Sequence, residues 1–122
     1  MSSVNDDVYQ EAKTQFSDGN YRVAEPLLEQ LILKGMKDPE LYWMLGTIAG
    51  DKGQFNKAIK IFRRALEVDP NFTDASVSLS ILLNDLGKYD EAKVVYNEAQ
   101  SRLDQKSNFD DPYWTEKIAL KH

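Results

Sequence analysis

The sequence of 122 residues contains no cysteine and only one histidine, His122. Without cysteine the chain can form neither a disulfide nor a thiolate zinc site, and it has no thiol nucleophile, so a redox role is excluded. A histidine at a chain end is poorly placed for catalysis. The acidic residues are spread at ordinary helical spacing, without a paired-carboxylate, phosphate-loop or metal-ligand pattern. We therefore expect a protein that is not an enzyme and that binds no metal or other cofactor.

Long apolar runs and an excess of basic charge are also missing. No stretch approaches the apolar length that spans a bilayer, and the first residues lack the basic start and apolar run of a secretion signal. The net charge of −5 argues against nucleic acid as a ligand, because binding to a phosphate backbone relies on clustered Lys and Arg. We expect a cytoplasmic protein that does not insert into membranes and that favours basic or neutral partners.

What the chain does contain is a pair of amphipathic helical patterns, clearest between Pro39 and Pro70. Apolar residues recur at helical spacing on both sides of Gly53, and Asp69-Pro70 ends the second pattern. The first set is Leu41, Tyr42, Leu45, Ile48 and Ala49, and the second is Phe55, Ala58, Ile59, Phe62, Ala65 and Leu66. This segment is predicted to form two helices joined by a short turn.

The same pattern recurs along the chain at a fixed interval. Gly19-Asn20-Tyr21, Gly53-Gln54-Phe55 and Gly87-Lys88-Tyr89 stand 34 residues apart, and an alanine follows each at the same distance. Within the clearest unit, the ordered set is Tyr42, Leu45-Gly46, Ala58, Phe62, Ala65 and Pro70. This period and this set resemble the tetratricopeptide repeat family, with Ala49 at a place where the family usually has Tyr.

The resemblance implies an all-α fold, a right-handed α-solenoid of three stacked antiparallel helix pairs. One domain, 1–122, would hold repeats at about 5–38, 39–72 and 73–106, followed by a short C-terminal capping helix at about 110–121. Asp38 is expected to cap the helix that begins at Pro39. Gly46 and Ala58 are expected to let two helices approach closely.

Three local irregularities stand out against this pattern. Pro26 falls inside the second predicted helix, where we expect a tolerated distortion. In the third repeat, Ser80 replaces the family glycine and Asp104 replaces the terminal proline. Without that proline the last helix is expected to continue until Ser107-Asn108 breaks it.

The family resemblance also implies that the first helix of each repeat lines a concave groove that binds a partner. Trp43 and Met44 have no place in the predicted core, and a step of one repeat from Trp43 leads to Tyr9 and Val77, an apolar row. The full set of expected groove residues is Tyr9, Lys13, Trp43, Met44, Thr47, Gly50, Val77, Ser78, Ile81 and Asn84. Alternatively, Tyr9 and Val77 pack sideways and Trp43 alone is exposed.

The margins of this groove are expected to be acidic. Asp6, Glu40 and Asp74 recur along one edge, and Asp51 and Asp85 lie near the other. Acidic residues in a first helical turn also complement the helix dipole, and both roles can coexist. Together they predict a ligand with apolar anchors flanked by Lys or Arg. Lys57, Lys60, Arg63 and Arg64 form a basic cluster on a second helix, either another contact site or a solvated outer face.

These features favour a protein–protein interaction adaptor or scaffold that binds a peptide or helix of a partner protein. The alternative is a small chaperone of a bacterial secretion or surface-assembly system that shields an apolar client segment. A family subgroup that clamps acidic tails fits poorly, because its basic and amide positions hold Tyr9, Lys13, Met44, Asp74 and Ser78 here. A third option is a homo-oligomer formed through Tyr113 and Trp114 of the C-terminal tail.

Overall fold

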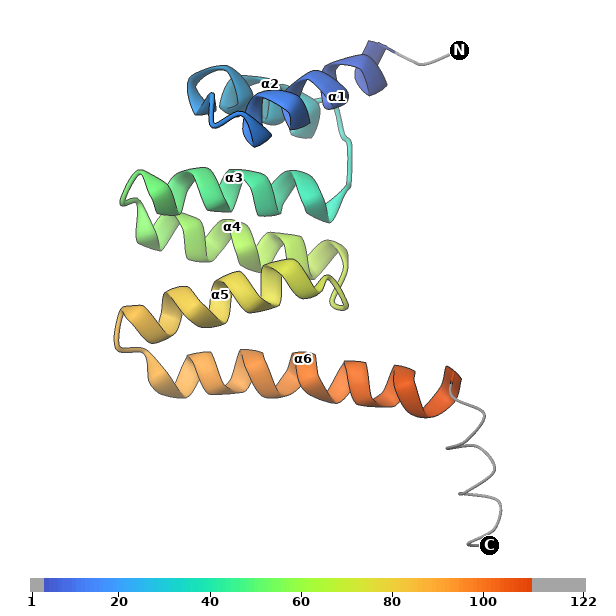
Figure 1. Cartoon of the computed structure of the whole chain (residues 1–122), viewed down its shortest axis with the longest axis vertical. Coiled ribbons are helices and arrows are strands. Elements are labelled where there is room, and N and C mark those ends of the chain that lie inside the picture. The colour runs from blue at the N-terminus through green and yellow to red at the C-terminus, as the bar shows by residue number, and fades with distance from the viewer. Residues whose placement is uncertain (1–3, 111–122) are drawn as a thin grey trace, which may run out of the picture.

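The computed structural model describes residues 4–110, which form six α-helices and no strand. The helices are α1 (Val4–Ser17), α2 (Tyr21–Leu33), α3 (Pro39–Asp51), α4 (Phe55–Val68), α5 (Thr73–Asp85) and α6 (Tyr89–Asp110). They form three antiparallel pairs that stack in chain order (Figure 1). The expected all-α solenoid is confirmed. No helix within residues 4–110 is long and apolar enough to cross a membrane.

The turn inside each pair has the same backbone geometry. Gly53 has φ of +78°, a conformation that costs glycine little, and its N–H donates to the carbonyl of Gly50 at 3.0 Å. The next N–H, of Gln54, donates to the carbonyl of Ala49 at 2.9 Å, which satisfies an otherwise free carbonyl at the end of α3. Gly19 and Gly87 have φ of +79° and +80°, so the 34-residue period of the sequence is a period of turn geometry.

The start of α3 is fixed by its cap. The Asp38 carboxylate accepts a hydrogen bond from the N–H of Glu40 at 2.9 Å, and Pro39 is the first helical residue. The prediction for this turn is confirmed. Helix α2 also runs through Pro26 without ending.

The last helix is longer than expected. Helix α6 continues through Ser107 and Asn108 to Asp110, so the prediction that these two residues end it is wrong. Serine and asparagine are only moderately unfavourable in a helix interior, and no glycine or proline follows Tyr89 before Asp110. The expected capping helix at 110–121 and the tail contacts of Tyr113 and Trp114 lie outside the described residues, apart from Asp110, which belongs to α6.

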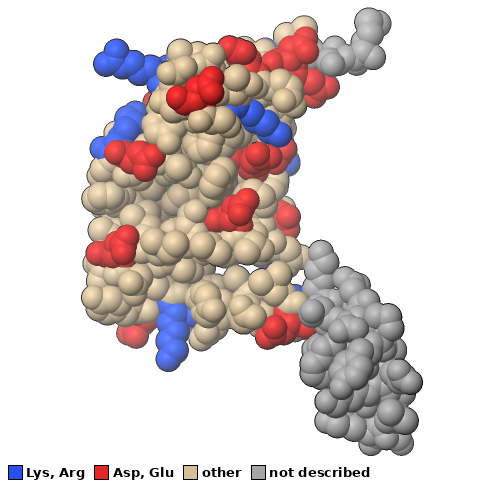
Figure 2. All heavy atoms as spheres, in the orientation of Figure 1, with Lys and Arg blue, Asp and Glu red and all other residues tan. Residues whose placement is uncertain are grey.

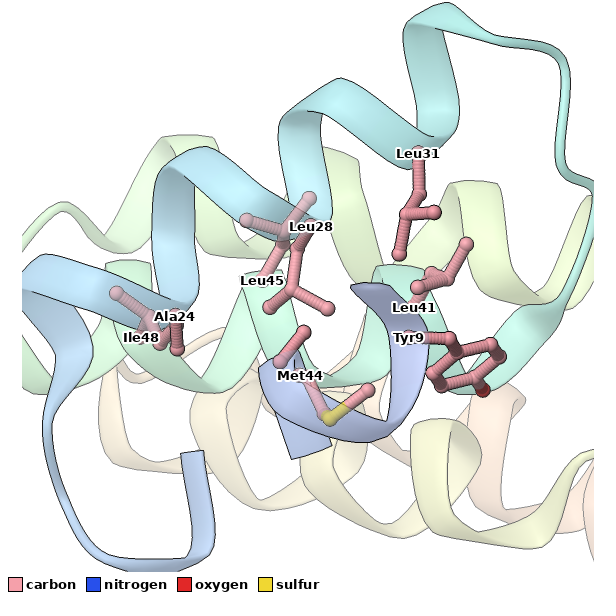
Figure 3. Close-up of a cluster of buried hydrophobic side chains, with 9 residues drawn as sticks. Tyr9, Ala24, Leu28, Leu31, Leu41, Met44, Leu45 and Ile48 are labelled. Carbon is pink, nitrogen blue, oxygen red and sulfur yellow. The ribbon is translucent and has the colours of Figure 1, made fainter. Parts of the chain in front are cut away.

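Two clusters of buried apolar residues lie one above the other in the stack. The first joins α1, α2 and α3 (Figure 3) and comprises Tyr9, Ala12, Ala24, Leu28, Leu31, Leu41, Met44, Leu45 and Ile48. The second joins α3, α4, α5 and α6 and comprises Ala49, Ala58, Ile59, Phe62, Leu79, Leu83, Ala92 and Val95. Helix α3 contributes to both clusters and is the central element of the described fold.

Close contact between α3 and α4 depends on a missing side chain. The Phe62 ring lies against Gly46, where an added Cβ would come within 2.6 Å of two ring atoms. At Gly50, one turn further along α3, an added Cβ would meet only the Cβ of Ala58, at 3.9 Å. The expectation that Gly46 permits a close approach is confirmed, and two glycines of one helix differ sharply in the room beside them.

We expect Gly46→Ala to lower the free energy of unfolding by about 1–3 kcal/mol, because the Phe62 ring must shift. Gly50→Ala is the matched control, and it should raise that free energy by up to about 1 kcal/mol through its helix propensity. Urea unfolding of both variants measures the difference. Equal effects at the two positions would contradict the packing described here.

Candidate partner-binding face

Helices α1, α3 and α5 form one face of the molecule, called here the first-helix face. Side-chain contacts join neighbours across it: the Phe16 ring meets the Trp43 ring, and the Trp43 Nε1–H donates to Ser78 Oγ at 3.0 Å. Figure 2 shows a largely uncharged middle with acidic side chains and several basic ones around it. This arrangement agrees with the one that the family resemblance implies, in which the first helices of the three repeats form one surface.

Trp43 is not the freely exposed anchor that the sequence suggested. It is half-buried and packs against both buried clusters. Its ring makes an edge contact with Phe16, with centroids 5.6 Å apart, and its only polar hydrogen is bonded to Ser78. Trp43 therefore links all three helices of the face, and part of its surface is still open to a ligand.

Met44 belongs to the core. Its side chain is 1% exposed and lies in the same cluster as Tyr9 and Ala12 of α1 (Figure 3). The expectation that Met44 lines the groove is wrong, because α1 packs over this side of α3. Tyr9 is buried as well, so the apolar row is not a continuous open strip.

The polar tip of Tyr9 is tied to the start of α3. Its hydroxyl donates to Asp38 Oδ2 at 2.9 Å and lies 3.3 Å from Glu40 Oε2. Lys13 Nζ lies 3.5 Å from the same Glu40 oxygen and 4.4 Å from the centroid of the Tyr9 ring. Lys13 and Glu40 thus form an ion pair whose two side chains are both partly exposed.

At the opposite end of α3, another tyrosine hydroxyl binds a carboxylate. The Tyr21 hydroxyl donates to Asp51 Oδ2 at 2.9 Å, and the Tyr21 ring stacks on Phe16 with centroids 5.6 Å apart. Asp51 is therefore a partner of the protein's own tyrosine. Together with the contacts of Tyr9, these bonds give Asp38, Glu40 and Asp51 partners within the protein.

Helix α5 presents the open half. Val77 and Ile81 are 47% and 57% exposed, and Asp74 and Asp85 are exposed at either end of them. At 100° per residue these four side chains fall within one narrow stripe of the helix. Within residues 4–110, the side-chain carboxylates of Asp74 and Asp85 make no hydrogen bond or ion pair. We call these four residues the α5 strip.

The remaining predicted residues have varied surroundings. The Thr47 hydroxyl donates to the Trp43 carbonyl at 2.9 Å, inside α3. Gly50 is half-buried, and a side chain there would begin beside Ala58 of α4. Asn84 and Asp6 are exposed. No cluster of acidic or histidine side chains that could hold a metal ion is present in the described part of the chain.

The inner position of Ser76 follows from the helical pattern of the third repeat, but its difference from Tyr42 was not predicted. Ser76 is buried, and it stands one repeat after Tyr42, at the place of a large aromatic. The same 34-residue step that located Val77 would have shown this difference.

The pKa of Tyr9 is raised well above its ordinary value by burial and by its hydrogen bond to Asp38. An unfolded tyrosine ionises near pH 10.0, whereas folded Tyr9 stays neutral there, so stability is retained below pH 10 and falls as the pH rises above it. We expect urea unfolding from pH 8 to 11 to show this decline, and Tyr9→Phe to make it shallower. An unchanged slope in that variant would exclude Tyr9 as the source.

We expect Trp43→Ala to lower the free energy of unfolding by about 3 kcal/mol, because it removes packing from both clusters. Tyr89→Ala, which removes an exposed aromatic from α6, is the control and should change it by less than about 0.5 kcal/mol. Urea unfolding compares the two. Similar small losses would show that Trp43 is not a structural residue.

Comparisons with known proteins agree with this architecture. A family model described as tetratricopeptide repeat matches residues 51–114. An uncharacterized protein of Methanocaldococcus jannaschii is 35% identical over 60 residues, which cover 49% of this chain and 70% of that protein.

Two solved structures share the fold at low sequence identity. The complex of the TPR2B domain of yeast Sti1 with pHsp70 aligns over 97% of this chain and 98% of that one, with 18% identity and a TM-score of 0.73. SycD, a type III secretion translocator chaperone of Yersinia enterocolitica, aligns over 98% and 87%, with 20% identity and a TM-score of 0.73. The repeat pattern, the stacked helix pairs and the family match lead to one conclusion: the chain belongs to the tetratricopeptide repeat family.

Proposed function

We propose that this protein is a non-catalytic interaction module that binds a segment of a partner protein on its first-helix face, centred on the α5 strip. The observation that carries the proposal is the contrast between the two halves of the face. In the α1–α3 half, the carboxylates of Asp38, Glu40 and Asp51 already have partners within the protein. The α5 half exposes two aliphatic side chains between two unpaired carboxylates.

The side chains of the α5 strip indicate which kind of ligand would fit. Covering Val77 and Ile81 removes apolar surface from water, at roughly 25 cal/mol per Å². Asp74 and Asp85 stand eleven residues apart, about 16 Å along the helix axis. Basic residues about five positions apart in an extended segment, or about eleven apart in a helix, would match that distance. The ligand we propose has apolar anchors flanked by Lys or Arg.

The same charges weigh against a ligand with an acidic tail. Asp74 and Asp85 would repel a carboxylate, and Lys13 is held by Glu40. The resemblance to Sti1 TPR2B concerns the fold, so its pHsp70 ligand is not transferred to this chain.

A chaperone for an apolar client segment is the second candidate. The SycD resemblance covers nearly the whole chain, and Tyr96 and Leu103 of α6 add exposed apolar surface beside Val77 of the α5 strip. A chaperone must release its client, whereas an adaptor stays in the assembled complex. Exchange of a bound labelled peptide against unlabelled peptide, with the rate measured by fluorescence anisotropy, separates a transient complex from a lasting one.

The proposal can be tested with a displayed library of random 12-residue peptides selected on the full chain. We expect enrichment of Lys and Arg on both sides of apolar residues. A labelled member of the selected set should bind the double variant Asp74→Asn and Asp85→Asn about three- to tenfold more weakly in fluorescence anisotropy, because both charge partners are lost. Added salt should weaken wild-type binding in the same direction.

Asp90→Asn is the matched control, because Asp90 is the second residue of α6 as Asp74 is the second residue of α5. It makes the same change of charge at the same helical position, away from the strip, and should leave the affinity unchanged. Selection of acidic peptides, or binding that ignores the α5 variants and is lost in Lys13→Ala, would contradict the proposal.

A further inference from the structure

A gap separates α5 from the second half of α6, and Figure 2 shows it as a narrow slit between these helices. Two hollows of about 330 Å³ and about 50 Å³ meet there, and Ser76 and Ala99 line both of them. The larger is lined by Leu66, Leu79 and Val95 and also by four exposed charged residues, Arg63, Glu67, Glu98 and Arg102. The smaller touches Val77 of the α5 strip.

Two differences between the second and third repeats explain the gap. Ser76 stands where the preceding repeat has Tyr42, so one aromatic ring is missing from α5. Ser80 stands where that repeat has Gly46. The Phe62 ring lies so close to Gly46 that a Cβ there would be 2.6 Å from it.

Ser80 carries such a Cβ, so the residue equivalent to Phe62 cannot take the same place. That residue is Tyr96, which is 57% exposed, whereas Phe62 is 4% exposed. In the third helix pair, one aromatic ring is therefore absent and another points out to solvent. The space between α5 and α6 stays open.

The smaller hollow, next to Val77, is suited to an apolar group, because no charged residue lines it. The polar group of Ser80 is satisfied, because its hydroxyl donates to the Ser76 carbonyl at 2.8 Å. Within the described chain no buried side-chain polar atom is left without a partner. An apolar side chain can enter the smaller hollow without breaking the hydrogen bond of Ser80.

We propose that the gap binds one aromatic side chain of the partner segment that lies on the α5 strip. Val77 belongs to both the strip and the smaller hollow, so one ligand can reach both. Thr73 lines the same hollow, and the unpaired carboxylate of Asp74 follows it directly, so the ligand has a Lys or Arg next to its aromatic residue. This inference rests on the proposed function and names the anchor residue of its ligand.

The test titrates p-cresol and 3-methylindole, the side-chain analogues of Tyr and Trp, into the ¹⁵N-labelled full chain. We expect saturable amide shifts around Ser76, Ser80 and Ala99. Ser76→Tyr, which restores the missing ring, should weaken this binding at least tenfold. Ala99→Leu fills the gap from α6 and serves if the first variant does not fold. Ser101→Tyr adds the same ring on an exposed part of α6 and should bind like the wild type.

Shifts that are absent, or that persist in both filled variants, would overturn the proposal. A shift of the Trp114 indole caused by Ser76→Tyr alone would mean that the chain's own tail fills the gap, and would also overturn it. Resonances of residues around the gap that change with protein concentration alone would indicate a second copy in the gap, and they would overturn the proposal as well. The probes carry no charge and no peptide, so their failure leaves the peptide-binding test of the proposed function independent.

Discussion

The packing of Trp43 is the contact on which the described structure most depends. This one side chain touches both buried clusters, meets Phe16 of α1 edge to face, and donates its indole N–H to Ser78 of α5. A stack of helix pairs is stable only where neighbouring pairs bury apolar surface against each other. Trp43 supplies that contact on both sides of α3, and the same residue stands in the middle of the first-helix face. In the proposed function, the residue that joins the repeats thus also lies beside the ligand.

The face is divided by what its charges already bind. At the α1–α3 end, tyrosine hydroxyls and one lysine engage Asp38, Glu40 and Asp51, so a ligand would have to replace bonds that exist. At the α5 end, carboxylates and aliphatic side chains are open to solvent and have no internal partner to displace. Binding costs less where nothing must be broken, which is the physical reason for placing the ligand on α5.

Local chemistry was predictable from the sequence, and contacts between repeats were not. The glycine turns, the Asp38 cap and the Gly46 approach follow from residue types within a few positions, and all three were anticipated. Met44 was assigned to the groove because its burial depends on how α1 settles over α3. The partners of Tyr9 lie 29 and 31 residues away, beyond the reach of a helical pattern. The missing aromatic ring at Ser76 is different, since a comparison with Tyr42 across one 34-residue repeat would have predicted it.

The central claim is that a partner segment occupies α5 and leaves the α1–α3 end as it is. Hydrogen–deuterium exchange of the full chain, with and without a saturating selected peptide, tests it most directly. The account predicts slower exchange along Thr73–Asp85 and the facing part of α6, with Val4–Ser17 unchanged. Protection concentrated in α1 and the start of α3, with α5 unaffected, would contradict it.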